Sequence, residues 1–208
     1  MDKNYWEEFY KTQNEELKPS LFAKYIKNNV IDHHKKLIEF GCGNGRDAIY
    51  FANEDLNVVA VDQCEEEINF LNQRYAQLKN ISFLAADFSQ LDDHSSYDLV
   101  YSRFTLHSVS KEQERRCLEW AYRNLNPEGC LCIEVRGQKN EIYKKGEKVN
   151  GEEDAYIYND HYRRFLNFDH LCGYLKELGF EIKFAAEEKD FAPFGGANET
   201  FIRIIAQK

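Results

Sequence analysis

The 208-residue sequence lacks any long apolar run. A membrane-spanning helix needs about 20 consecutive apolar residues, and no stretch of this chain approaches that length, so we expect no membrane span. The opening residues, MDKNYWEEFY, are acidic and aromatic and hold no apolar signal-peptide core. We therefore expect a cytoplasmic protein.

Metal-binding spacing is also missing. The six cysteines are scattered, form no CxxC pair and have no histidine at metal-ligand spacing. Scattered cysteines of this kind usually fill small apolar spaces in a reducing compartment. We expect no bound metal ion.

Positive charge is scarce. There are 27 Lys and Arg residues against 36 Asp and Glu residues, which gives a net charge of −9. A general nucleic-acid binder needs a basic face to neutralise phosphates. The charge balance therefore argues against DNA or RNA as a partner.

What the sequence does contain is typical of one globular domain. The chain is 43% hydrophobic and 30% charged, and its length is sufficient to bury a core without disulfides or metals. We expect residues 1–208 to form a single domain.

The stretch at residues 36–52, KLIEFGCGNGRDAIYFA, organises the rest of the chain. A short apolar strand runs into Gly41, Gly43 and Gly45, and an amphipathic helix follows. Glycines let the backbone turn sharply and approach a ligand, and a helix N-terminus offers unpaired N–H groups to an anion. The layout is typical of a nucleotide site, although a glycine turn that only joins a strand to a helix is the alternative.

The glycine spacing separates two kinds of site. A dinucleotide fingerprint, G-x-G-x-x-G, would place its third glycine at position 46, which is Arg46. The sequence instead reads G-x-G-x-G after the acidic Glu39. It resembles motif I of the class I S-adenosylmethionine (SAM) methyltransferases, with Cys42 at a variable place.

Acidic residues follow the next two predicted strands. The strand at 57–62 ends in Asp62, about 20 residues beyond the first glycine, where a carboxylate can accept from ribose hydroxyls in NAD or SAM. A helix N-cap is the alternative for this residue. The strand at 81–86 is followed by Asp87-Phe88, the place where SAM enzymes hold an adenine-binding acid beside an apolar residue; a turn aspartate is the alternative.

The predicted fourth strand, residues 97–102, should end at the point where strand order reverses, which is where open α/β sheets bind ligands. Ser102 closes this strand and His107 follows soon after. We predict His107 as a base or an acceptor-orienting group, with a structural histidine as the equal alternative. A helix at 111–125, a turn and a fifth strand at 130–135 come next.

Two segments fall outside the strand–helix alternation. Residues 1–30 read as helical, and their aromatic residues, Tyr10 among them, predict either a lid over the cofactor or a helix packed on the core. Residues 136–166 form a highly charged insert on the ligand-binding edge. We read most of it as a solvated loop, and we predict that Arg136, His161, Tyr162, Arg163 and Arg164 serve the acceptor.

The end of the chain gives a discriminating prediction. After a helix at 168–178, the strands at 180–186 and 201–206 have no convincing helix between them, so they should pair antiparallel. A dinucleotide fold ends in a parallel strand, whereas a class I methyltransferase ends in a reversed seventh strand.

The resemblance to class I methyltransferases covers roughly residues 36–206. It implies a doubly wound, Rossmann-like α/β sheet of order 3-2-1-4-5-7-6 with an antiparallel last strand and helices on both faces. It implies SAM as cofactor and S-adenosylhomocysteine as product. We expect either a monomer or a homodimer, a choice that the sequence leaves open. The residues assigned to the cofactor are Tyr10, Glu39, Gly41, Cys42, Gly43, Gly45, Arg46, Asp62, Gln63, Asp87, Phe88 and Ser102.

Within that family, short stretches such as GNGRD, YWEEFY and NDHYRRF resemble the tellurite-resistance-type enzymes and relatives found with bacterial surface-polysaccharide biosynthesis. The NPPY-type motif of nucleic-acid amino-methylating enzymes is absent. Because SAM is already activated, the protein mainly aligns its reactants and excludes water. The arginines favour O-methylation of a small, polar, anionic acceptor. A nicotinamide-dependent oxidoreductase and a non-catalytic SAM-fold interaction module are the alternatives.

Overall fold

A computed structural model describes residues 18–31, 35–92 and 94–208. Tyr10 and the lid predicted for the first residues therefore lie outside the described part of the chain. The described part of the N-terminal segment contains α2 (Leu21–Asn29). Ser20 caps the first turn of this helix, because its hydroxyl accepts a hydrogen bond from the Ala23 amide at 2.9 Å.

The molecule is built on a seven-stranded sheet of order β3-β2-β1-β4-β5-β10-β9. Strands β1 to β5 run parallel, and β10 is antiparallel to both of its neighbours. The predicted strand order and the reversed last strand are confirmed. The strands are β1 (Lys36–Phe40), β2 (Asn57–Asp62), β3 (Ile81–Ala85), β4 (Tyr97–Arg103), β5 (Leu125–Val135), β9 (Glu181–Glu188) and β10 (Phe201–Gln207).

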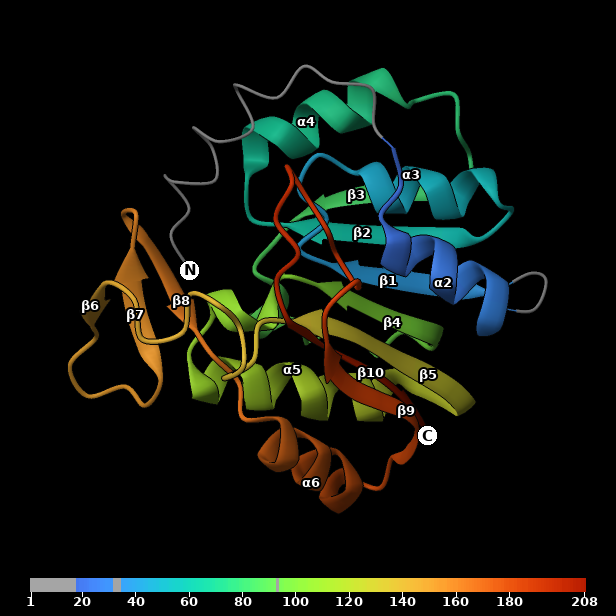
Figure 1. Cartoon of the computed structure of the whole chain (residues 1–208). Helices are drawn as coiled ribbons and strands as arrows, with labels where there is room; N and C mark the ends of the chain where they lie inside the picture. The colour runs from blue at the N-terminus through green and yellow to red at the C-terminus, as the bar shows by residue number, and fades with distance from the viewer. Residues whose placement is uncertain (1–17, 32–34, 93) are drawn as a thin grey trace.

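Helices cover both faces of this sheet, as predicted (Figure 1). One layer holds α2, α3 (Arg46–Asn53) and α4 (Glu65–Arg74), and the other holds α5 (Lys111–Asn124) and α6 (Phe168–Leu178). Two short 3₁₀ turns, η1 (Phe88–Gln90) and η2 (Leu106–Ser108), follow β3 and β4.

Side-chain alternation along the central strands divides the core into two layers. Ile38 and Val100 pack in the cluster under α5, whereas Leu37 and Leu99 pack in the cluster under α2 and α3. Successive strand residues point to opposite faces, so a strand buried on both sides must be apolar throughout. This is why β1, β2 and β4 were recognisable in the sequence.

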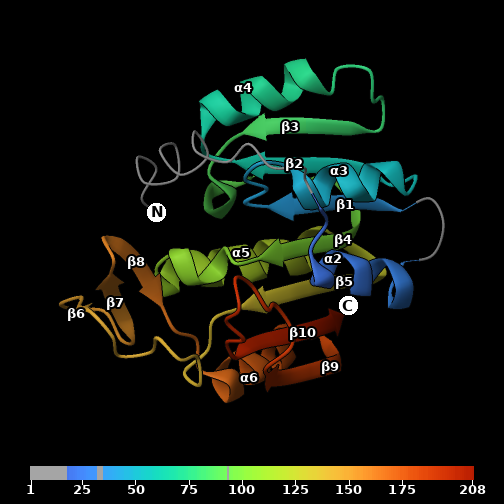
Figure 2. The ribbon, with the colours of Figure 1, turned by 45° about the horizontal axis from the view of Figure 1, so that its top comes forward.

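The insert is more regular than predicted. Strands β6 (Glu147–Lys148), β7 (Ala155–Tyr158) and β8 (His161–Arg164) form a separate antiparallel sheet. The β7–β8 turn places Asn159 and Asp160 at φ of 52° and 55°, a backbone that asparagine and aspartate tolerate in two-residue hairpins. Figure 2 shows this sheet beyond the arrowheads of the parallel strands, on the predicted ligand-binding edge.

Two negative findings concern the described residues alone. None of the helices in the described ranges is both long and apolar enough to cross a membrane. Nor do three or more of the described histidine, cysteine, aspartate and glutamate residues gather where they could hold a metal ion.

Candidate cofactor and acceptor site

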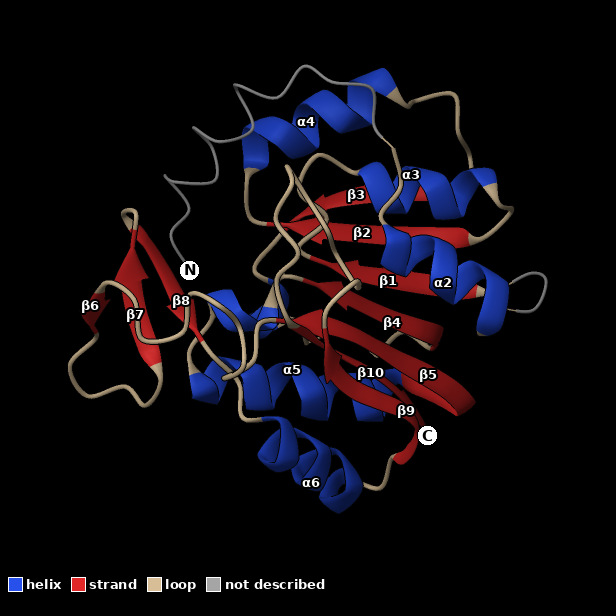
Figure 3. Cartoon of the chain, in the orientation of Figure 1, coloured by secondary structure: helices blue, strands red, loops and turns tan. Residues whose placement is uncertain are grey.

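The site lies where the carboxyl ends of β1 and β4 meet. These two strands are neighbours, with Phe40 paired to Ser102, and the sheet continues in opposite directions from them. The glycine loop leaves β1 at this point, and the chain leaving β4 turns into η2. In Figure 3 the loops that follow these strands meet at this edge, with the long β9–β10 connection beside them.

The glycine loop has a backbone that other residues rarely adopt. Gly41, Gly43 and Gly45 have φ of 65°, 53° and 75°, in the left-handed region that favours glycine. A Cβ at Gly41 would collide with the side chain of Thr105. Gly45 precedes α3, and no side chain caps that helix, so its first N–H groups face a ligand or solvent.

Glu39 is a buried carboxylate at the end of β1. Its exposure is 4%, and its Oε2 atom has no hydrogen-bond partner among the described residues. Burial, with the nearby Asp47 carboxylate as a second cause, raises the pKa of Glu39 well above its ordinary value. An unsatisfied buried acceptor is uncommon in native proteins, and it marks a place where a ligand can donate a hydrogen bond.

Asp62 fastens the glycine loop to β2. Its carboxylate accepts from the Gly43 amide at 2.9 Å and from the Cys64 amide at 3.0 Å. Each carboxylate oxygen has a second lone pair, so these bonds leave room for the predicted ribose contact. Next to it, the Nε2 of Gln63 is buried without a hydrogen-bond partner in the described chain. It is a second buried polar atom, a donor, that lacks a described hydrogen-bond partner at the ends of the central strands.

The Asp87–Phe88 pair forms the start of η1, with Asp87 as its N-cap. Asp87 accepts from Ser89 and Gln90; burial acts to raise its pKa, but these hydrogen bonds outweigh it and lower the pKa. The Phe88 ring is 2% exposed and stacks on Phe40 at 5.6 Å. The 3₁₀ turn directs this ring toward Phe40 and the core cluster under α5, and its contact with an adenine ring stays a prediction.

Three other predicted cofactor residues lie around the loop. Cys42 is 5% exposed, and burial raises the pKa of its thiol well above the ordinary value. Arg46 lies 3.8 Å from the Asp47 carboxylate at the start of α3. Ser102 is buried, with its hydroxyl 2.5 Å from that of Thr105.

A hydrogen-bond network centred on Asp47 supports the glycine loop at the start of α3. The sequence did not reveal this network. The carboxylate of Asp47 accepts from the Ser20 amide and hydroxyl, both at 2.7 Å, and from the Tyr101 hydroxyl at 2.9 Å. It thereby joins α2, α3 and β4 beneath the glycine loop. No spacing in the sequence connects these residues, which are 27 and 54 positions apart.

The predicted base His107 lies in η2, which follows β4, and is 4% exposed. Its Nδ1 lies 3.5 Å from the Arg136 amide, at the limit of a hydrogen bond, and its ring is 5.9 Å from that of Phe104. Burial, followed by the charges of Arg136 and Arg163, lowers its pKa well below the ordinary value. His107 is therefore neutral at physiological pH. Phe104 itself has a φ of 61°, a strained backbone of the kind that concentrates at functional sites.

The three predicted arginines differ in how they are held. Arg136 donates to Glu199 at 2.5 Å and to Asn140 at 2.8 Å, and Arg163 donates to the Tyr158 carbonyl at 2.9 Å. Arg164 is buried and forms an ion pair with Glu114. It also donates to the carbonyls of Val109 and Leu106.

The geometry of Arg164 thus fits a structural role, because its guanidinium fastens β8 to α5 and η2. The predicted base Tyr162 is similarly engaged: it donates to Glu152 at 2.5 Å, and burial together with that carboxylate raises its pKa. A phenol of raised pKa that already donates its proton is poorly suited to accept one. His161 is buried and contributes to the positive field at His107.

Sequence reasoning missed Glu199 and Phe201. The Phe201 ring is tilted by 33° against that of Phe104, with the centroids 4.8 Å apart, and the Arg136 guanidinium lies 5.0 Å from its centroid. The predicted strand direction could have revealed both residues. An antiparallel last strand starts at the edge where the parallel strands end, so residues at its beginning lie near the site.

The comparisons with known proteins all find methyltransferases. Residues 37–129 match a family model described as "Methyltransferase domain". The chain is 25% identical over 112 residues to phosphoethanolamine N-methyltransferase of Plasmodium falciparum, which covers 53% of the chain and 42% of that protein. It is 36% identical over 88 residues to ribosomal RNA small subunit methyltransferase G of Clostridium botulinum, 38% of the chain and 37% of the relative.

A third relative is the probable SAM-dependent methyltransferase TehB of Haemophilus influenzae, 28% identical over 42% of the chain and 33% of that protein. The chain therefore matches less than half the length of each of these three relatives.

Solved structures match much more of the chain. A SAM-dependent methyltransferase from Methanosarcina mazei superposes with a TM-score of 0.73 at 22% identity, over 88% of this chain and 96% of that one. The chain has the fold of a class I SAM-dependent methyltransferase. A methyltransferase of Burkholderia thailandensis solved with 1,6-didemethyltoxoflavin and S-adenosylhomocysteine superposes with a TM-score of 0.68 at 22% identity, over 89% and 76%.

The residues of this methyltransferase fold suit SAM, the cofactor of the family. SAM carries an ammonium donor, and the buried Glu39 Oε2 lacks a partner among the described residues. Gly41 packs against the Thr105 side chain, which leaves no room for a Cβ there, and this contact fixes the course of the left-handed glycine loop beside the site. Asp62, Gln63 and Asp87 supply polar atoms around the same edge. The donor set therefore fits the cofactor.

Proposed function

We propose that the chain transfers a methyl group from SAM to a hydroxyl oxygen of a small, polar, anionic acceptor. The observation that carries the proposal is the environment of His107, a buried and neutral imidazole surrounded by arginine charges at the end of β4. We further propose that residues 1–208 act as one domain, with residues 1–30 and the 136–166 insert as parts of it.

On the cofactor side, SAM supplies a methyl group that is already activated for transfer. The chain's own task is to hold it in line with the acceptor. Glu39 would accept from its ammonium, Asp62 from its ribose and Asp87 from its adenine amine. The glycine loop and the uncapped start of α3 would receive its carboxylate.

On the acceptor side, the positive field has two consequences. It attracts an anion to Arg163 and, in competition with Glu199, to Arg136, both of which act on His107. It also disfavours protonation of His107 in the absence of an anion. Burial lowers the pKa of His107 and the arginine charges lower it further, and an anionic acceptor offsets those charges. His107 would take the hydroxyl proton in this setting as the methyl group moves.

The relatives offer indirect support. Phosphoethanolamine and 1,6-didemethyltoxoflavin, named with two of the similar proteins, are small polar molecules. Both proteins are named as N-methyltransferases, so a nitrogen acceptor is the outcome that would change the proposed reaction. A role in surface-polysaccharide biosynthesis is the hypothesis that follows from the sequence resemblance.

The test is methyl transfer measured as S-adenosylhomocysteine formed per acceptor added. The acceptors are hydroxycarboxylic acids and phosphorylated alcohols, each compared with its neutral methyl ester or unphosphorylated alcohol, and matched amino acids and amines. We expect turnover with anionic hydroxyl compounds and little with their neutral forms. Turnover restricted to amines would overturn O-methylation, and turnover equal for charged and neutral acceptors would overturn the anionic acceptor.

Arg163→Gln sharpens this test. We expect KM for an active anionic acceptor to rise about tenfold or more, as loss of a charge-assisted contact predicts, with the SAM dissociation constant unchanged. The matched control is Arg74→Gln on α4, where the guanidinium stacks over Phe70 and Tyr75. Equal effects of the two substitutions would remove Arg163 from the acceptor site.

A further inference from the structure

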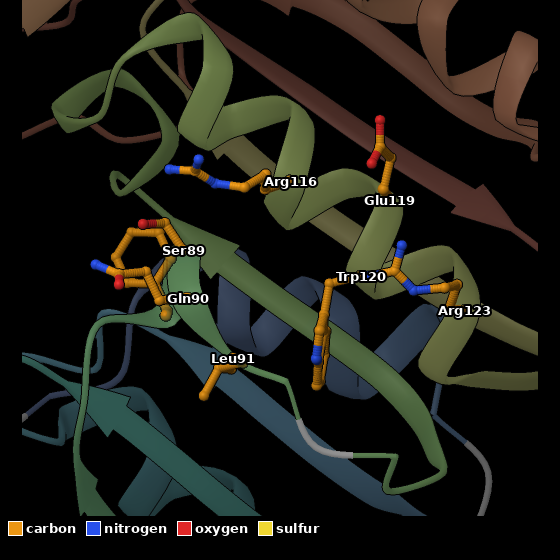
Figure 4. A pocket seen from close by; sticks show the side chains of 8 residues that line it. Ser89, Gln90, Leu91, Arg116, Glu119, Trp120 and Arg123 are labelled. Carbon is orange, nitrogen blue, oxygen red and sulfur yellow. The ribbon is translucent and has the colours of Figure 1, made fainter.

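A cavity of about 310 Å³ lies between α5 and the segment that follows β3 (Figure 4). Its walls include Arg116, Trp120 and Arg123 from α5 and Gln90 and Leu91 from the other segment. No residue of the glycine loop lines it. Phe88, which directly follows the proposed adenine acceptor Asp87, does line it, so the cavity borders the proposed cofactor site on the side of α5. The proposed function makes no use of it.

The cavity exists because little covers this flank of α5. The helical element described between β3 and β4 is η1, a single turn of three residues. The chain then passes Leu91 toward β4 without a further described helix. A volume of this size falls at the lower end of small-molecule sites, about 300–1,000 Å³.

Besides the volume of the cavity, the buried indole of Trp120 also indicates a ligand. Its side chain is 2% exposed, and its ring is held against Phe40 at 5.5 Å and Tyr97 at 5.8 Å. The indole Nε1 is buried and has no acceptor among the described residues. Buried donors are nearly always satisfied, and an indole N–H can only donate. The missing partner must bring an acceptor atom.

The charges of the wall specify an anion. Arg116 and Arg123 are seven residues apart, two helical turns, and so lie on the same side of α5. The pair between Arg116 and Glu112, at 3.0 Å, is exposed and weak. The guanidinium of Arg123 has no ion pair with a described residue. The acidic residue of the wall, Glu119, already accepts from the Tyr174 hydroxyl at 2.8 Å.

We propose that this cavity binds a planar organic anion, a ring that carries a carboxylate. The carboxylate accepts from a guanidinium of Arg116 or Arg123 and from the Trp120 indole, and the ring packs against Leu91. Planar carboxylates suit arginine because the guanidinium can donate two parallel hydrogen bonds to them. The ligand carboxylate replaces the exposed Glu112 as the partner of Arg116. This replacement costs little free energy because an exposed ion pair is weak.

The experiment follows the indole N–H resonances by two-dimensional ¹⁵N–¹H NMR of the full chain without SAM. The sequence contains two tryptophans, Trp6 and Trp120, and a Trp6→Phe sample identifies the signal of Trp120. The probes are benzoate, benzamide as its neutral counterpart, and inorganic phosphate. We expect benzoate to move the Trp120 signal saturably downfield, and benzamide and phosphate to leave it in place.

Substitutions locate the binding. In Arg116→Gln/Arg123→Gln we expect the benzoate dissociation constant to rise about tenfold or more. The matched control is Arg115→Gln, since Arg115 stacks over Tyr174 on another side of α5; it should bind benzoate as the native chain does. No saturable shift with benzoate, or the same shift in the double variant, overturns the site. An equal response to phosphate overturns the aromatic ligand. Because SAM is absent, the result does not depend on the methyltransferase proposal.

Discussion

The two sides of the β1–β4 edge are built in different ways. On the cofactor side, buried polar atoms such as Glu39 Oε2 and Gln63 Nε2 have no partner among the described residues. On the acceptor side, the charged groups are joined in ion pairs, Arg136 with Glu199 and Arg164 with Glu114. On the first side, Asp62 and Asp47 anchor the loop while buried polar atoms keep hydrogen-bonding capacity for a ligand. On the second side, the charges of Arg136 and Arg164 are already paired within the protein.

This difference predicts how each side responds to substitution. Removing a charge on the acceptor side should affect turnover or folding. Removing backbone freedom on the cofactor side should affect SAM affinity, with folding much less changed. Four substitutions test the comparison.

The largest effect is expected for His107→Gln. Loss of a general base reduces turnover about 10²–10⁴-fold, and the SAM dissociation constant should stay unchanged because His107 lies on the acceptor side. His170→Gln on the exposed surface of α6 is the matched control. Steady-state rates with a saturating acceptor and calorimetric SAM titration measure the two quantities. Undiminished turnover in His107→Gln would show that no base acts here.

A smaller effect on a different quantity is expected for Arg164→Gln. Breaking a buried ion pair leaves Glu114 buried without its partner and costs about 3–5 kcal/mol, so the free energy of unfolding should fall by about that amount. Urea denaturation measures it. The double substitution Arg164→Met/Glu114→Leu should recover much of the loss. If Arg164→Gln instead keeps full stability and loses only acceptor binding, the residue belongs to the acceptor site.

Gly41→Ala tests the opposite side. The left-handed backbone and the collision with Thr105 should distort the loop at a cost of about 1–3 kcal/mol. We expect SAM affinity to fall by up to about 100-fold. Gly173→Ala, a position in α6 with no atom near an added Cβ, should leave affinity unchanged and slightly raise stability. Equal SAM affinity in both variants would separate the loop from the cofactor.

Glu39→Gln should have the smallest effect, about tenfold on SAM affinity through loss of one charge-assisted hydrogen bond. Its pH dependence is diagnostic. The folded-state pKa of Glu39 is raised, so protonation favours the folded state, and this contribution is lost as pH rises through the folded pKa. The native chain should therefore lose stability relative to Glu39→Gln on going from acid to neutral pH. A constant difference would mean that Glu39 titrates normally.

The two sides also differed in how far the sequence predicted them. Strands β1, β2 and β4 are largely apolar on both faces, and the glycine spacing is local. The sheet order and the course of the loop could therefore be predicted from the sequence. The direction of the Phe88 ring could not. An apolar residue after a strand can face a ligand or the core, and the 3₁₀ turn that decides this leaves no periodic pattern.

The acceptor side was harder for a related reason. Its ion pairs join residues 50 and 63 positions apart, and opposite charges in a sequence do not reveal which of them meet. The small β6–β8 sheet has mixed charges, so its alternation was hidden. Its turn signal was Asn159-Asp160, whose left-handed backbone a two-residue hairpin requires.

The position of β10 has a consequence for synthesis. This strand follows β9 in the chain, yet it lies between β5 and β9 in the sheet. Until residues 201–207 have left the ribosome, the neighbouring edges of both strands are open, and open edges invite pairing with other chains. The sheet therefore closes only after release of its last strand, and a nascent chain stalled before residue 201 is the species that most needs protection from aggregation.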